Sequence, residues 1–223
     1  MLSLPAFRGN TMRKLLTSLL LCLLLPLSAQ AGIYDDMLKA VLDNHTDEAV
    51  ALLDRGMDPN TADAEGSTLL MLAARNGNAE LVDQLILRRA KVAARNRYGD
   101  DALLLASFRG FLPVVKLLVA GGAPVNRSEG WQPLVYAAFN GHVDIMAYLL
   151  EHGAEVNGAS DNGTTALMVA ARNGHPEVVR LLLKHHPDVD KINEAGGTAL
   201  KWAVAANNTE IADLLRKAGA VLE

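Results

Sequence analysis

The sequence is poor in cysteine and in aromatic residues. One cysteine, Cys22, occurs among 223 residues, and aromatic side chains make up 4% of the chain. A single cysteine excludes an intrachain disulfide framework and a cysteine-rich zinc site. Because aromatic residues are scarce in a chain that is 50% hydrophobic, leucine, alanine and valine must supply the core. This composition favours helices over a β-sandwich.

The sequence also lacks a basic excess and the common catalytic motifs. Its formal net charge of −4 argues against general nucleic-acid binding, and its apolar fraction excludes an intrinsically disordered chain. It contains no phosphate-binding loop, GxGxxG, HExxH or GxSxG motif. The adjacent pair His185–His186 has no third ligand nearby in sequence, so no metal site is expected. We expect no catalytic residues, no cofactor and no enzyme activity.

The N-terminal 31 residues have the three parts of a secretory signal peptide. Arg13 and Lys14 supply a positive charge, residues 15–25 form an apolar run, and residues 29–31 read Ala-Gln-Ala. This pattern predicts cleavage after Ala31, with translation starting at Met1 or Met12. The alternative is an uncleaved anchor, although the run is short for a hydrocarbon core of roughly 30 Å.

Removal of this leader changes the charge and the cysteine count of the remaining chain. Residues 32–223 keep 18 of the 21 basic residues and all 25 acidic residues, so their net charge is −7, and they contain no cysteine. A cysteine-free chain suits an oxidising compartment. We therefore predict a periplasmic or secreted protein that has no membrane attachment after cleavage.

Five glycine-led segments repeat along the rest of the chain. The glycines lie 33, 31, 33 and 33 residues apart; they are Gly66, Gly99, Gly130, Gly163 and Gly196. Eleven residues after each comes a second turn residue, namely Gly77, Gly110, Gly141, Gly174 or Asn207. A period of this length predicts stacked units that bury a shared core.

Within each unit the sequence predicts two short helices. A Thr or Asp two residues after the first glycine, such as Thr68 or Asp101, can cap the first helix. The second glycine, or Asn207, can take the left-handed conformation that reverses the chain. A leucine-rich second helix follows, and neither helix can bury its apolar face alone.

The repeat resembles the ankyrin repeat. The period, the Gly-x-Thr-x-Leu opening, the Gly-His pairs at Gly141 and Gly174 and the closing Gly-Ala-x-Val-Asn at 153–157 carry the resemblance. It implies an all-α solenoid of about six stacked helix-turn-helix units with short hairpin fingers. The predicted domain covers 32–223, with units at about 32–62, 63–95, 96–126, 127–159, 160–192 and 193–223.

Two departures from the family pattern lead to further expectations. The usual histidine of the Thr-Pro-Leu-His motif is replaced by Met71, Leu104, Val135, Met168 or Lys201. We therefore expect stability to rest more on apolar packing than on a polar network. The turn between Asn126 and Gly130 is two residues short, so we expect a blunted finger there.

The resemblance implies that partners bind to the fingers and to the exposed face of each first helix. The residues carried over to that surface are Arg75, Asn76, Tyr98, Phe108, Arg109, Trp131, Phe139, Asn140, Arg172 and Asn173. Four of the nine aromatic residues outside the leader fall on this surface, and aromatic and Arg side chains often dominate interfaces. The alternative is that Phe108 and Phe139 pack between units. Tyr136 and Trp202 occupy positions usually given to core leucine.

These observations favour an exported, monomeric, non-catalytic module that binds a protein partner. One alternative is an accessory or protective factor for a co-expressed periplasmic enzyme, for example in peroxide defence, which the resemblance permits and no residue requires. A further alternative is an uncharacterised hydrolase, which no motif supports.

Overall fold

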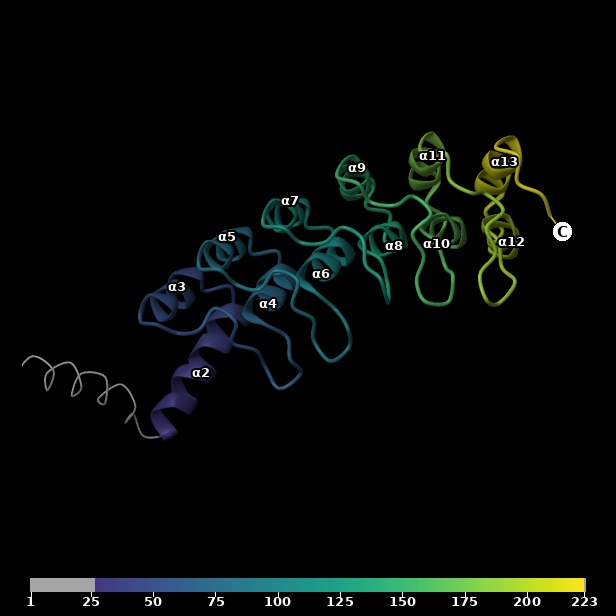
Figure 1. Ribbon diagram of the computed structural model, residues 1–223. Coiled ribbons are helices and arrows are strands. Elements are labelled where there is room, and N and C mark those ends of the chain that lie inside the picture. Colours follow the sequence, from purple (N-terminus) through teal and green to yellow (C-terminus); the bar gives the residue numbers. More distant parts are fainter. Residues whose placement is uncertain (1–26, 223) are drawn as a thin grey trace, which may run out of the picture.

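The protein is a single stack of helical pairs. A computed structural model describes residues 27–222, which contain twelve α-helices and no strands, labelled α2 to α13 (Figure 1). The helices form an inner row and an outer row, and the connecting fingers extend from the inner row on the side away from the outer helices (Figure 1).

Each unit contributes one inner and one outer helix. The inner helices are α2 (Leu27–Leu42), α4 (Leu69–Asn76), α6 (Ala102–Arg109), α8 (Pro133–Phe139), α10 (Ala166–Asn173) and α12 (Ala199–Ala205). The outer helices are α3 (Thr46–Asp54), α5 (Ala79–Leu87), α7 (Leu112–Ala120), α9 (Val143–Glu151), α11 (Pro176–Lys184) and α13 (Thr209–Lys217). The predicted all-helical repeat fold is confirmed.

Most of the predicted leader, residues 1–26, lies outside the described residues. Helix α2 begins at Leu27 and runs through Ala31, the predicted cleavage position. The side chains by which α2 enters the core, Met37, Ala40 and Val41, all follow that position. The signal peptide remains a prediction.

Thr or Asp caps the start of four inner helices, α4, α6, α10 and α12, as the sequence predicted, whereas α8 begins after Gln132 without a side-chain cap. The Thr68 hydroxyl accepts a hydrogen bond from the Met71 N–H, and the Asp101 carboxylate accepts one from the Leu104 N–H. At the other end, Gly110 has the left-handed conformation, with φ of 87°, and Asn207 has φ of 58°. Helices of seven to nine residues are unstable alone, so their packing in the stack must hold them.

The core runs continuously through the stack between the two rows. It consists almost entirely of Leu, Ala, Val, Ile and Met side chains from every described helix. Alanine pairs of the inner helices, such as Ala73–Ala74 and Ala170–Ala171, are fully buried. Their small side chains allow neighbouring inner helices to approach closely.

The finger between α7 and α8 is shorter than the others. Residues 121–132 make this connection, which is 12 residues long, whereas 55–68, 88–101, 152–165 and 185–198 each span 14. The shortening predicted from the sequence is therefore present. In this short finger, Arg127 contacts Asp101 at the start of α6, and Trp131 packs against Tyr136 of α8.

Candidate functional site

The predicted binding residues all lie on inner helices or fingers, but they do not form one cluster. Tyr98 and Trp131 belong to fingers, and the other eight belong to, or directly follow, the inner helices α4, α6, α8 and α10. Tyr98 is 63% exposed. The structure brings Phe108, Trp131 and Phe139 together around α6 and α8, whereas Arg75 on α4 and Arg172 on α10 lie in other units.

Three predicted binding residues hold neighbouring units together. The side-chain amide of Asn76 donates to the carbonyl of Val41 at 3.1 Å, and that of Asn173 donates to the carbonyl of Phe139 at 2.8 Å. Asn140 donates to the carbonyl of Phe108 at 2.6 Å. Carbonyls at the end of a helix have no partner within it, so these amides satisfy groups that the preceding inner helix leaves open.

Two histidines contribute to the same inter-unit contacts. The Nε2 atom of His142 lies 3.2 Å from the carbonyl oxygen of Phe108, and that of His175 lies 3.0 Å from the carbonyl oxygen of Phe139. Loss of the motif histidine led us to expect that stability rests more on apolar packing, and the structure adds polar contacts between units to that packing. A different polar network, built from Asn and His side chains, connects the units.

Replacement of Asn173 by alanine tests whether this asparagine is structural. We expect N173A to lower the free energy of unfolding by about 1–2 kcal/mol, because one acceptor at the end of α8 loses a donor. Arg109 occupies the same repeat position, is exposed, and gives a matched control: R109A should change stability by less than about 0.5 kcal/mol. Urea unfolding measures both variants, and equal losses would contradict the structural role.

Four aromatic side chains form a half-buried cluster across α6, α8 and the short finger. The Phe108 ring packs edge-on against Tyr136, with centroids 5.3 Å apart, and the Phe108 and Phe139 centroids are 6.2 Å apart. Trp131 lies 5.3 Å from Tyr136. We call Phe108, Trp131, Tyr136 and Phe139 the aromatic cluster. Phe108 packs on Tyr136 and Phe139 of the next unit, and all four side chains remain partly exposed. Phe108 and Phe139 therefore combine the two alternatives that the sequence left open.

The sequence reasoning assigned Tyr136 and Trp202 to the core, but both are half-buried. Tyr136 joins the aromatic cluster, and the guanidinium of Arg172 stacks over the Trp202 ring at 4.8 Å. Tyr136 lies three residues before Phe139, a spacing that places both on one helix face. From that spacing, Tyr136 could have been assigned to the same surface as Phe139.

An open hollow of about 510 Å³ lies beside the aromatic cluster, between the fingers that follow α5 and α7. We call it the finger hollow. Three aromatic rings line it, those of Tyr98, Trp131 and Tyr136. The charged residues that line it are Arg95, Asp100, Arg127, Glu129 and Asp161.

A buried ion pair forms the base of the short finger. The Nε atom of Arg127 lies 3.5 Å from an Asp101 carboxylate oxygen, and the two side chains are only 2% and 3% exposed. Arg127 also donates to the carbonyl of Trp131 at 3.0 Å and to that of Gly99. Arg127 therefore fixes the short finger against its neighbour. Sequence reasoning missed this role, because a turn arginine is usually exposed.

The environment of Asp101 opposes its ionisation. Burial raises the pKa of Asp101 above its ordinary value, while the hydrogen bond from the Leu104 N–H and the positive charges of Arg127 and Arg95 act in the opposite direction. The carboxylate thus depends on Arg127 for compensation of its charge.

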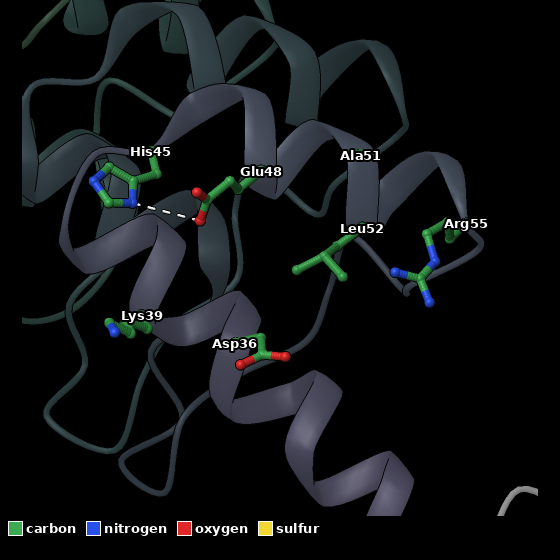
Figure 2. A pocket seen from close by; sticks show the side chains of 7 residues that line it. All are labelled: Asp36, Lys39, His45, Glu48, Ala51, Leu52 and Arg55. Atoms are coloured by element: carbon green, nitrogen blue, oxygen red, sulfur yellow. Dashed lines mark ion pairs between the residues drawn. The ribbon is translucent and has the colours of Figure 1, made fainter.

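A second hollow, at the N-terminal end of the stack, has a different character. Figure 2 shows its lining: Asp36 and Lys39 from α2, Glu48, Ala51 and Leu52 from α3, and His45 and Arg55, which directly precede and follow α3. His45 Nδ1 lies 3.4 Å from Glu48, and both side chains are more than half exposed. Such mixed, solvated charges are typical of the polar outer face of an end unit.

Neither metal ligation nor membrane insertion is indicated in the part of the chain that the structure describes. There, no three His, Cys, Asp or Glu side chains are grouped to hold a metal ion. Over the same residues, every helix is too short or too polar to cross a bilayer.

Fold and surface together define a helical-repeat solenoid whose units contact only their neighbours. A family model that describes three consecutive ankyrin repeats matches residues 37–129, 70–160 and 156–223. The chain therefore belongs to the ankyrin-repeat family. Ankyrin repeats generally mediate protein–protein interaction, and the repeat itself is not catalytic.

Several curated proteins are similar to parts of this chain. Rat ankyrin repeat and SAM domain-containing protein 6 is 34% identical over 112 residues, 48% of this chain and 13% of the relative. Pig NF-kappa-B inhibitor alpha is 40% identical over 96 residues, 40% of this chain and 31% of the relative. An ankyrin repeat-containing protein of Treponema pallidum is 33% identical over 126 residues, which are 54% of this chain and 41% of the relative. The chain thus spans less than half the length of each of these relatives.

Proposed function

We propose that this protein is an exported, monomeric, non-catalytic module that binds a protein partner through its inner helices and fingers. The observation that carries the proposal is the exposed Tyr98 beside the finger hollow and the aromatic cluster. Tyr, Trp and Arg side chains contribute most to binding where they cluster at an interface. Export follows from the predicted cleavage after Ala31, and the partner is expected in the periplasm or outside the cell.

The outer helices offer no comparable group of aromatic residues. Leu87 on α5 is 67% exposed, but a single exposed apolar side chain is common on protein surfaces and needs no partner. Tyr98 differs because Trp131 and Tyr136 line the same hollow. We therefore expect the partner to contact the inner face.

Photo-crosslinking at one residue of each face tests this proposal. A photoreactive phenylalanine analogue replaces Tyr98 in one protein and Leu87 in another, and each is irradiated in periplasmic extract of the source cells. We expect a covalent adduct with a discrete protein from position 98 and none from position 87. Equal adducts from both positions, or an adduct from position 87 alone, would contradict binding by the inner face.

A double substitution at exposed residues measures the energetic contribution of the same face. We expect Tyr98→Ala with Arg109→Ala to weaken binding to the crosslinked protein at least about tenfold. Both side chains are exposed, so helicity and melting temperature should be unchanged. Titration calorimetry with the purified partner gives the affinity. Trp131 is left intact because its ring packs against Tyr136.

A further inference from the structure

We infer that the finger hollow receives a basic side chain, Arg or Lys, from the protein partner. The inference rests on the proposed function and adds the chemistry of the partner. Three carboxylates, those of Asp100, Glu129 and Asp161, share the hollow with the three aromatic rings. A cation can be attracted by both kinds of group at once.

The two cations that line the hollow do not cancel these carboxylates. Arg127 is paired with the buried carboxylate of Asp101, and it also donates to the carbonyls of Gly99 and Trp131. Arg95 is then the one cation among the lining residues that is left to oppose Asp100, Glu129 and Asp161. The lining itself holds three carboxylates and two arginines. Together with Asp101, the partner of Arg127, the group holds four carboxylates and two arginines, an excess of two negative charges.

Local contacts hold one of the carboxylates at the edge of the hollow. Asp161 accepts a hydrogen bond from the Gly130 N–H at 2.6 Å, which connects the short finger to the next finger. A second carboxylate acts on an aromatic residue of the hollow: burial and the negative charge of Asp100 raise the pKa of Tyr136, and the positive charge of Arg127 opposes them without reversing the shift. A negative field close to aromatic rings favours a cation.

The size and polarity of the hollow suit a long basic side chain. Lys and Arg have apolar stems that pack along apolar surface and a charged end that reaches polar groups. The rings of Trp131 and Tyr136 offer the apolar wall, and Glu129 and Asp100 offer the acceptors. An acidic side chain would be repelled by the three carboxylates, and an aromatic side chain would leave these carboxylates without a counter-charge.

Nuclear magnetic resonance with a short arginine peptide tests this inference directly. The probe is acetyl-Gly-Arg-Gly-amide, and its control contains citrulline, which has a similar shape without the charge. The indole N–H signal of Trp131 reports binding, and that of Trp202, the second tryptophan of the chain, serves as an internal reference. We expect millimolar binding that shifts Trp131 and not Trp202, is at least about fivefold weaker for citrulline, and weakens as salt increases.

Neutral substitutions in the hollow provide the matched variants. Glu129→Gln and Asp100→Asn should each weaken the arginine peptide about two- to fivefold. Glu194→Gln removes an exposed carboxylate from another finger and should leave binding unchanged. Equal binding of the citrulline peptide, stronger binding of peptides carrying Glu or Phe at that position, or an unshifted Trp131 signal would overturn the inference.

The crosslinking result separates this inference from the proposed function. If Tyr98 still crosslinks a partner but the arginine peptide does not shift Trp131, the basic side chain is wrong and the binding face stands. If the crosslink from Tyr98 is absent as well, both fail.

Discussion

Replacing Asp101 by asparagine should lower the free energy of unfolding by about 3–5 kcal/mol, because it leaves the Arg127 cation buried without a counter-charge. Arginine cannot lose its proton in a protein, so the cost cannot be relieved by deprotonation. Asparagine is as good an N-cap as aspartate, so the start of α6 is preserved and does not confuse the result. Urea unfolding at neutral pH measures the loss.

The opposite substitution, Arg127→Met, should have a smaller and pH-dependent effect. It leaves a buried Asp101 carboxylate, which can be neutralised by taking up a proton. Without Arg127, the pKa of Asp101 rises further, since the positive charge that opposed the effect of burial is gone. A raised pKa in the folded state means that the native protein binds the proton more tightly than the unfolded chain.

The sign of the pH dependence follows from that difference. Below the ordinary pKa of an aspartate, about 3.9, Asp101 is protonated in both states and adds no cost. In the unsubstituted protein the pKa of Asp101 is also raised, so as the pH rises from there both proteins first lose stability in parallel. The deficit of R127M then grows between the two folded-state pKa values and is constant above the higher one, that of R127M. Unfolding measured between pH 4 and 7 should show the deficit growing with pH.

The double variant supplies the control for both single substitutions. D101N together with R127M removes both charges, and we expect it to be more stable than D101N alone, because the unpaired buried cation is gone. A D101N loss below about 1 kcal/mol would mean that the pair is solvated. An R127M deficit that does not change with pH would contradict the assigned role of Asp101.

Replacing Gly110 by alanine should cost about 2–5 kcal/mol, partly from backbone strain and partly from a contact with the neighbouring unit. Gly110 has φ of +87°, and a Cβ atom there would lie 2.6 Å from Cε1 of His142. The left-handed conformation alone costs an L-residue roughly 1–2 kcal/mol. Displacement of the His142 ring from its contact with the Phe108 carbonyl adds a packing cost of about 1–3 kcal/mol.

Gly99 gives the matched control for this prediction. Its φ is +81°, and nothing lies within 4 Å of an added Cβ. We therefore expect G99A to lose only the conformational part, roughly 1–2 kcal/mol. Thermal or urea unfolding of the two variants separates backbone strain from the inter-unit contact. Equal losses of unfolding free energy in the two variants would show that the His142 ring moves aside without a measurable cost.

The sequence predicted the repeat, its helices and its turns because these depend on local chemistry. Glycine tolerates the left-handed backbone at Gly110 as few residues do, and Thr68 caps a helix by contacts within three residues of the chain. Asn207, at φ of 58°, could be recognised as a substitute for glycine for the same reason. Such features recur with the period of the repeat, so they can be recognised in a single sequence.

The candidate site was predicted less completely, since its chemistry depends on contacts about one repeat apart in sequence. Asn140 and Asn173 were expected on the binding surface, but their amides donate to carbonyls 32 and 34 residues earlier in the chain. Tyr136 was expected in the core, yet it is half-buried and packs against Phe108 and Trp131. Sequence spacing gives the face of a helix but not the neighbour that covers it.

The sequence by itself determined the family and the number of units, because hydrophobic periodicity and turn chemistry are local to each unit. The face on which a partner binds stays a prediction. Only the tertiary structure decided how the short finger is built. In the finger that is two residues shorter than the others, Arg127 points inward onto Asp101, and the direction of a turn side chain is set by the surfaces that it meets. That buried pair neutralises one cation of the finger hollow and leaves its carboxylates in excess.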